Sequence, residues 1–179
     1  MKICIVNPGR CGSTVVLASL ANKLDNFSMI YEVINYENGL YVLQANQNII
    51  FKYQFLYALT PLKGADKYII VDRKDKDAWI YSTYMSAVNY HWHGSLKNTE
   101  NKFFDQNNFD VAKDNLLSLY KNYWIPERER LLTEEKADII WQEDINITED
   151  VYIDLPPRKN IKLTPVWSPT YKGTYYGLS

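Results

Sequence analysis

Short runs of apolar residues alternate along the chain with longer segments whose apolar residues recur at helical spacing. The apolar runs predict β-strands at residues 2–6, 29–34, 67–71 and 138–142. Two of these runs, Tyr68–Val71 and Ile139–Trp141, are apolar without interruption, which is typical of strands buried on both faces. The pattern therefore predicts a sheet with packing on both sides.

The helical spacing predicts helices at residues 13–24, 75–88 and 109–135, and a helical stretch near 48–59. Pro126 is expected to end or kink the longest of them. A polar loop is expected at 92–108, and weak periodicity predicts that roughly the last 30 residues wrap the surface. Strands that alternate with helices indicate an α/β protein with three layers, α/β/α, around a parallel sheet. Ligands of such sheets bind at the carboxyl ends of the strands.

The length of 179 residues fits one domain, residues 1–179. The net charge of −1 argues against a protein that coats nucleic acid, although it allows a local basic pocket. Cys4 and Cys11 are too close together for a useful disulfide, which favours a reducing, cytoplasmic setting. The chain goes directly into its first strand, and no apolar run is long enough to span a membrane. We therefore expect a cytoplasmic protein with neither a membrane nor a nucleic acid as partner; the oligomeric state is open.

The first candidate site follows the first strand, in the segment Asn7–Thr14. A strand, a Pro/Gly-containing loop and a helix that begins at Ser13 form a cradle for an anion, because the first N–H groups of a helix have no partner within it. Glycines allow close approach of the backbone, and Arg10 adds a guanidinium suited to phosphate or sulfate. The spacing differs from a Walker A loop, which ends in Gly-Lys-Ser/Thr. An ordinary strand-to-helix turn is the simpler interpretation.

The second candidate site follows the strand at 67–71. The segment Asp72–Ser82 is a charged turn that leads into a helix, which Asp75 or Asp77 is expected to cap. Arg73 and the neighbouring lysines could bind a second anion at this strand end. A solvated charged turn is again the simpler interpretation.

Together these segments resemble the PAPS-dependent sulfotransferases, where PAPS is 3′-phosphoadenosine 5′-phosphosulfate. The order Pro-x-Arg-x-Gly-Ser-Thr at Pro8–Thr14 resembles their 5′-phosphosulfate loop. The spacing from Arg73 to Ser82 resembles the bacterial trehalose-type pattern Arg-Arg-Asp-Lys-x-Ala-x-x-x-Ser. Two weaker fragments occur in the family's order, Ile139–Ile145 and Tyr171–Thr174, the latter similar to a Ser-Lys-Gly-Arg loop.

The resemblance implies a sulfotransferase fold related to P-loop nucleoside triphosphate hydrolases. It implies transfer of a sulfuryl group from PAPS to a hydroxyl acceptor, for which a carbohydrate is one candidate, without a metal. Each residue role is implied in the same way. The 5′-phosphosulfate would be held by Arg10 and the amides of Cys11, Gly12, Ser13 and Thr14, with Arg10 also stabilising the charge on the leaving oxygen. The 3′-phosphate would be held by Arg73 and Ser82, with Lys172 and Gly173 closing over the nucleotide.

Sulfuryl transfer needs a base for the acceptor proton. Glu32 lies near the carboxyl end of the second strand, which we expect to neighbour the first, and the resemblance places a carboxylate base at a similar distance beyond Arg10. An exposed strand residue without a catalytic role is the alternative interpretation. Glu37 is the reserve candidate. His91 and His93 are expected on the surface or beside the acceptor, because two histidines alone make a poor metal site.

Three other functions fit parts of the pattern. A P-loop kinase or nucleotide phosphotransferase would share the cradle, but Asp72 is the clearest candidate to hold Mg²⁺ at a strand end. Cys4 and Arg10 have the Cys-x5-Arg spacing of a phosphatase, although Cys4 lies in an apolar strand. A non-catalytic nucleotide-binding protein that retains the cradle is the third. The acceptor pocket is expected from loops 35–48 and 91–108, which carry no recognisable code.

Overall fold

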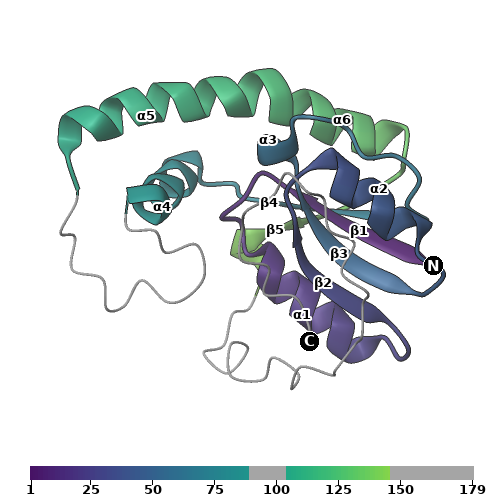
Figure 1. Cartoon of the computed structure of the whole chain (residues 1–179). Coiled ribbons are helices and arrows are strands. Elements are labelled where there is room, and N and C mark those ends of the chain that lie inside the picture. The colour runs from purple at the N-terminus through teal and green to yellow at the C-terminus, as the bar shows by residue number, and fades with distance from the viewer. Residues whose placement is uncertain (89–103, 146–179) are drawn as a thin grey trace.

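The computed structural model of the chain describes residues 1–88 and 104–145 (Figure 1). In this part of the chain five parallel strands form one sheet in the order β2-β3-β1-β4-β5. The strands are β1 (Lys2–Asn7), β2 (Ser28–Val33), β3 (Ile49–Gln54), β4 (Lys67–Asp72) and β5 (Asp138–Trp141). The predicted α/β class with a central parallel sheet is confirmed.

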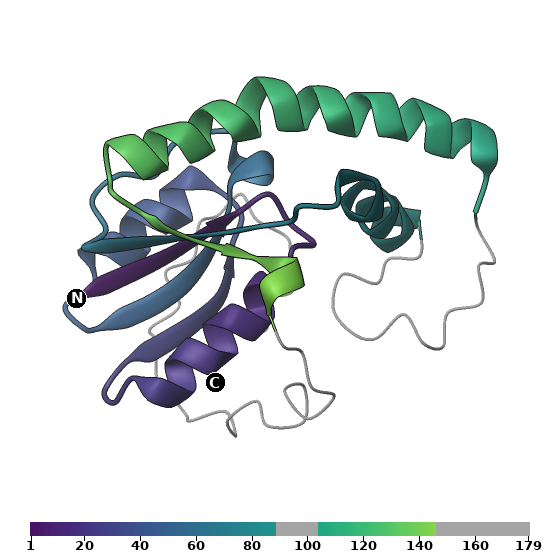
Figure 2. The same ribbon diagram turned by 180° about the vertical axis from the view of Figure 1, so that it is seen from behind.

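Helices cover both faces of this sheet (Figures 1 and 2). They are α1 (Ser13–Lys23), α2 (Tyr36–Gln44), α3 (Phe55–Ala58), α4 (Lys76–Val88), α5 (Gln106–Leu119), the π-helical segment η2 (Tyr120–Trp124), α6 (Ile125–Thr133) and the short 3₁₀ turn η3 (Gln142–Asp144). One buried cluster lies between α1 and the sheet, where Val16 and Leu17 pack with Ile5. A second lies on the opposite face and contains Phe51 and Trp124. These two clusters give the three layers that the pattern predicted.

The segment at 48–59 was predicted to be helical, and this prediction is wrong. Residues Ile49–Gln54 form β3, which pairs with both β1 and β2, and only the four residues of α3 are helical. Strand and helix follow one another without a Gly, Pro or other turn signal, and a mostly apolar run does not distinguish a strand from a buried helix. The expected pairing of the second strand with β1 is therefore also wrong, because β3 lies between them.

One further expectation is wrong, and another is specified more closely by the structure. The segment at 35–48, expected to be an acceptor loop, contains helix α2, whose N-cap Asn35 accepts a hydrogen bond from the backbone N–H of Asn38 at 2.8 Å. The long helical region predicted at 109–135 is present and, of the two outcomes expected at Pro126, it does not end there. It passes through η2 immediately before this proline, where the altered hydrogen-bond pattern accommodates a residue that has no N–H to donate.

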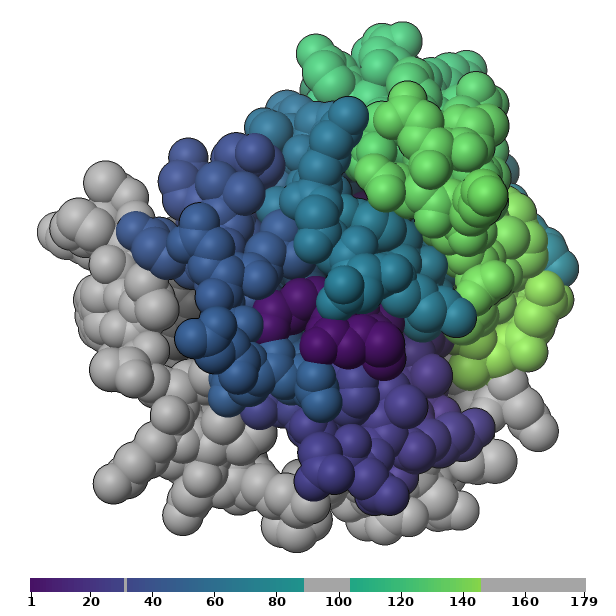
Figure 3. All heavy atoms as spheres, turned by 90° about the vertical axis from the view of Figure 1, so that its right-hand side faces the viewer, coloured from purple at the N-terminus to yellow at the C-terminus, as the bar shows by residue number. Residues whose placement is uncertain are grey.

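At the amino ends of the strands, the start of the chain is hydrogen-bonded to the segments before β3 and β4. The start of the chain is enclosed there by the segments that lead into β3 and β4 (Figure 3). Backbone N–H groups of Ile49 and Asp66 donate to the carbonyls of Met1 and Lys2, each at 3.0 Å. Within the described residues, the structure contains no helix both long and apolar enough to cross a membrane.

Candidate functional site

The loop after β1 is held in an unusual backbone conformation. Gly9, Arg10 and Gly12 all have positive φ angles, of 89°, 51° and 79°. Glycine adopts this region freely, whereas for arginine it costs roughly 1–2 kcal/mol. The buried side chain of Asn7 accepts a hydrogen bond from the N–H of Gly9 at 2.9 Å, and the indole of Trp79 in α4 donates to the Gly9 carbonyl at 2.8 Å. Strand end and helix α4 together fix the loop.

Helix α1 begins directly after this loop. Its N-cap residue is Gly12, which has no side chain to satisfy the first N–H groups of the helix. Cys11 faces inward, where its thiol donates to the Val71 carbonyl at 3.0 Å. Burial and, to a smaller extent, the charge of Asp72 raise the pKa of this thiol to about 12, so Cys11 is a core residue whose backbone alone can face the cradle. The strand, loop and helix predicted for the cradle are thus all present.

A buried lysine that no sequence motif singled out lies beside the cradle. Lys52, in the middle of β3, is 3% exposed, and its ammonium donates to the Thr14 hydroxyl at 3.0 Å. The same ammonium lies 3.3 Å from a carboxylate oxygen of Glu32 on β2. One buried charge therefore connects the proposed base to the first turn of α1. In the sequence, Lys52 is a single charged residue within a mostly apolar run. Because residues 48–59 were predicted to be helical, its place in a buried strand was missed.

Arg10 and Ser82, 72 residues apart in the sequence, are in direct contact. The Arg10 Nε–H donates to the Ser82 hydroxyl at 3.2 Å, from the loop after β1 to helix α4. Tyr57 of α3 lies nearby, since a side chain built on Gly9 would approach its ring at 3.9 Å. The pKa of this tyrosine rises to about 12, mainly through burial and secondarily through the charge of Glu32. The first and second candidate sites thus meet at one edge of the sheet.

Arg73 lies one helical turn from this contact. Its guanidinium donates to the carbonyl of Ala78 at 3.3 Å, and Ala78 precedes Ser82 by four residues. The two arginines therefore approach the same helix, α4. Asp75 caps that helix as predicted, because its carboxylate accepts a hydrogen bond from the N–H of Ala78 at 2.9 Å.

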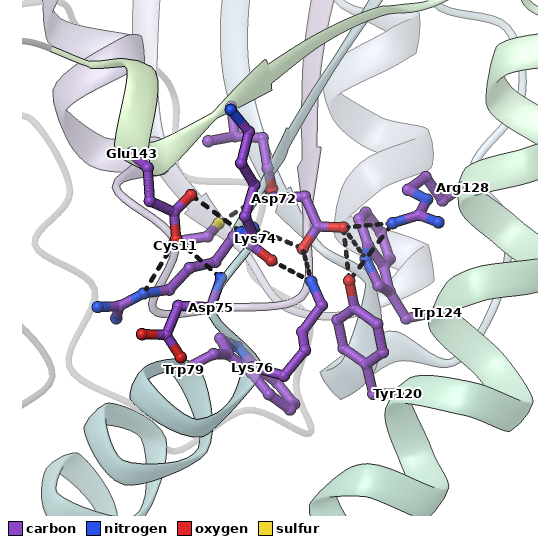
Figure 4. A network of polar contacts seen from close by, with 12 residues as sticks. Cys11, Asp72, Lys74, Asp75, Lys76, Trp79, Tyr120, Trp124, Arg128 and Glu143 are labelled. Carbon is purple, nitrogen blue, oxygen red and sulfur yellow. Dashed lines mark hydrogen bonds and ion pairs between the residues drawn. The ribbon is translucent and has the colours of Figure 1, made fainter.

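An internal carboxylate occupies the turn where the second anion was expected (Figure 4). Glu143 of η3 accepts hydrogen bonds from the backbone N–H groups of Lys74, at 2.9 Å, and Asp75, at 3.0 Å. Its nearer oxygen lies 3.7 Å from Arg73 Nε. Partial burial raises the pKa of Glu143, but the two amides and the arginine lower it more, and the net shift is downward. The sequence pattern gave no sign that this turn is already bound to a carboxylate.

Asp72, at the end of β4, is completely buried and hydrogen-bonded on both oxygens (Figure 4). Its donors are the Arg73 N–H (2.7 Å), Lys76 Nζ (3.3 Å), the Tyr120 hydroxyl (2.6 Å), the Trp124 indole (3.0 Å) and Arg128 Nη1 (2.9 Å). Burial raises the pKa of Asp72, yet the bonds from Tyr120 and Trp124 and the charge of Lys76 lower it below its ordinary value. This carboxylate could not bind Mg²⁺ without losing several of these bonds.

The phosphatase interpretation does not survive the structure. Cys4 lies in the middle of β1, fully buried in the cluster beneath α2 and α6, and burial raises its pKa well above the ordinary thiol value. A nucleophilic thiolate needs the opposite environment. Cys4 and Cys11 are both free thiols, as their spacing predicted.

Of the predicted site residues, the structure brings together Arg10, Ser82, Arg73 and the cradle, and Lys52 connects Glu32 to Thr14. The predictions for Lys172, Gly173, His91 and His93 lie outside the described residues. In the described ranges 1–88 and 104–145, no group of three or more His, Cys, Asp or Glu side chains could hold a metal ion. No protein-family model, curated protein or solved structure matches this chain.

Proposed function

We propose that this protein is a PAPS-dependent sulfotransferase that transfers a sulfuryl group to a hydroxyl acceptor, with a carbohydrate as the first class to test. The observation that carries the proposal is the hydrogen bond from Arg10 to Ser82. It joins two segments that were each expected to bind one end of the same nucleotide. Arg73, in the turn before α4, adds the second guanidinium, which contacts the carbonyl of Ala78 one helical turn before Ser82.

The cradle supplies what the 5′-phosphosulfate needs. The start of α1, which has no side-chain cap, offers backbone donors; Arg10 in the preceding loop and the Lys52 ammonium at Thr14 add positive charge. Groups fixed in place before the reaction can each stabilise charge on the leaving oxygen by about 3–4 kcal/mol. Lys52 is held by Thr14 and Glu32, so its charge is oriented by the fold.

Glu32 is the proposed base. Its carboxylate is partly exposed, so an acceptor can reach it, and it contacts the ammonium that also contacts the cradle. In the proposed transfer, Glu32 takes the proton of the acceptor hydroxyl while the acceptor oxygen attacks sulfur. The S–O bond to the phosphate breaks, and adenosine 3′,5′-bisphosphate leaves with the electron pair.

The kinase alternative is disfavoured by the hydrogen bonds of Asp72. Both oxygens of this carboxylate already accept protein donors, including the Tyr120 hydroxyl and the Trp124 indole. A kinase built on this site would need a strand-end acid available to Mg²⁺. The non-catalytic alternative keeps the same nucleotide pocket and differs only in the absence of transfer.

Calorimetric titration in EDTA with adenosine 3′,5′-bisphosphate, ATP and GTP tests the proposal. We expect the bisphosphate to bind most tightly, and Arg10→Ala to weaken it about 10- to 100-fold, because a charged hydrogen bond contributes about 1.5–3 kcal/mol. Lys63→Ala, which removes an exposed cation far from the site, is the control and should bind as the wild type does. Tighter binding of ATP that requires Mg²⁺ would favour a kinase. Unchanged bisphosphate binding by Arg10→Ala would contradict the cradle.

A further inference from the structure

The turn η3 contacts both halves of the proposed nucleotide site. Its Glu143 binds the turn before α4, as described above. Its Gln142, together with Ile145, packs against Gly12 of the first loop, where an added side chain would meet either residue at 3.4 Å. A single short segment at the end of β5 therefore lies across the loops that follow β1 and β4.

The carboxylate of Glu143 has the partners that a phosphate would have at the same turn. Two consecutive backbone N–H groups bind its two oxygens, and an arginine stands beside it at 3.7 Å. Phosphate has more acceptor oxygens and more charge than a carboxylate, so it would form stronger bonds with these donors. Both anions cannot occupy the same two N–H groups at once.

Two buried polar atoms, one within η3 and one beside it, have no hydrogen bond among the described residues. They are Arg73 Nε and the side-chain oxygen of Gln142. Buried polar atoms are nearly always satisfied, and leaving one unsatisfied costs about 1–3 kcal/mol. While Glu143 is bound to the turn, these two polar atoms of the region thus remain without a hydrogen bond.

We propose that η3 is an internal competitor for phosphate: Glu143 holds the turn before α4, and a phosphate that binds Arg73 and this turn displaces it. The inference rests on the proposed function, which places the 3′-phosphate at Arg73. It adds that the second anion pocket is regulated by a carboxylate of the chain itself. Because η3 also contacts Gly12, displacement of Glu143 would loosen the cover of the first loop.

Titration of the full chain with inorganic phosphate, followed through the backbone amide NMR signals of Lys74 and Asp75, tests this directly. Glu143→Gln keeps the size of the side chain and removes its charge, so we expect phosphate to bind this turn about tenfold more tightly than in the wild type. Asp144→Asn is the matched control. It removes the neighbouring charge, which binds the exposed Lys74 ammonium at 2.7 Å and does not contact the turn amides, and it should change the affinity less than about twofold.

Equal or weaker phosphate binding in Glu143→Gln would overturn the proposal and leave Glu143 with a purely structural role. The wild type gives a second readout that needs no variant to fold. Phosphate should shift the side-chain carboxyl ¹³C signal of Glu143 together with the two amides, and amide shifts without it would also overturn the proposal. Phosphate binding at this turn with no binding of adenosine 3′,5′-bisphosphate would leave the competitor in place and refute the sulfotransferase.

Discussion

Two carboxylates at the same edge of the sheet, Asp72 on β4 and Glu32 on β2, are used in opposite ways. Asp72 is completely buried and accepts five hydrogen bonds, which join the sheet to η2, α4 and α6. Glu32 is 27% exposed and contacts the ammonium of Lys52. Their chemistry follows from this difference: a buried, fully bonded carboxylate holds structure, whereas a partly exposed one can still exchange a proton with a substrate.

Glu32→Gln should have the largest effect, and this effect should be on catalysis. A positioned base contributes about 10²–10⁴-fold, so transfer from PAPS should fall by that factor. Adenosine 3′,5′-bisphosphate should still bind, because the glutamine keeps the shape of the side chain and removes no donor of the cradle. Loss of the ion pair with the buried Lys52 should in addition lower the free energy of unfolding. Single-turnover transfer and calorimetry on the same preparation measure the two effects separately. Glu37→Gln, at the exposed start of α2, is the control; loss of transfer in that variant instead would move the base to Glu37.

Asp72→Asn should mainly affect stability. It removes the negative charge that Arg128 and Lys76 neutralise. It also places the amide NH₂ group of asparagine against groups that are themselves hydrogen-bond donors. Breaking such a buried pair costs about 3–5 kcal/mol, measurable as a lower free energy of unfolding in urea. Asp138→Asn, which removes a 67%-exposed partner of Lys67, should cost less than about 1 kcal/mol. Similar losses in both variants would mean that the network around Asp72 is not coupled as its contacts suggest.

The sequence predicted an element correctly where its segment followed a single hydrophobic pattern, that of a strand or that of a helix. The β1 and β4 strands, the helices that follow them and the cap at Asp75 lie where their patterns predicted. It failed at Ile49–Ala58, where a strand and a helix follow one another in a single apolar run. Because of that one error β2 was expected beside β1, and Lys52 of β3 was not recognised as a residue of the sheet.

Contacts between residues far apart in the sequence could also not be predicted from the hydrophobic pattern. Neither the hydrogen bond from Arg10 to Ser82 nor that from the Lys74 N–H to Glu143 has a local signature, since each joins residues about 70 positions apart. The charges around Asp72 appeared as a solvated turn, although the aspartate itself is buried. The charge pattern shows only that the turn is rich in charged residues. Whether Asp72 is buried depends on the later segments that cover the turn, here η2 and α6.

The smallest expected effect comes from relieving backbone strain in the cradle. It distinguishes a change in folding stability from a change in nucleotide binding. Arg10 and Lys136 have nearly the same positive φ, 51° and 50°, but only Arg10 belongs to the site. Glycine relieves this strain, so Lys136→Gly should raise the free energy of unfolding by about 0.5–1 kcal/mol. Arg10→Gly should gain less, between zero and about 0.5 kcal/mol, because it also loses the bond to Ser82. Urea unfolding and bisphosphate calorimetry should show both variants at least as stable as the wild type, with binding weakened only in Arg10→Gly. A clear loss of stability in Arg10→Gly would instead make Arg10 part of the structural framework, like Asp72.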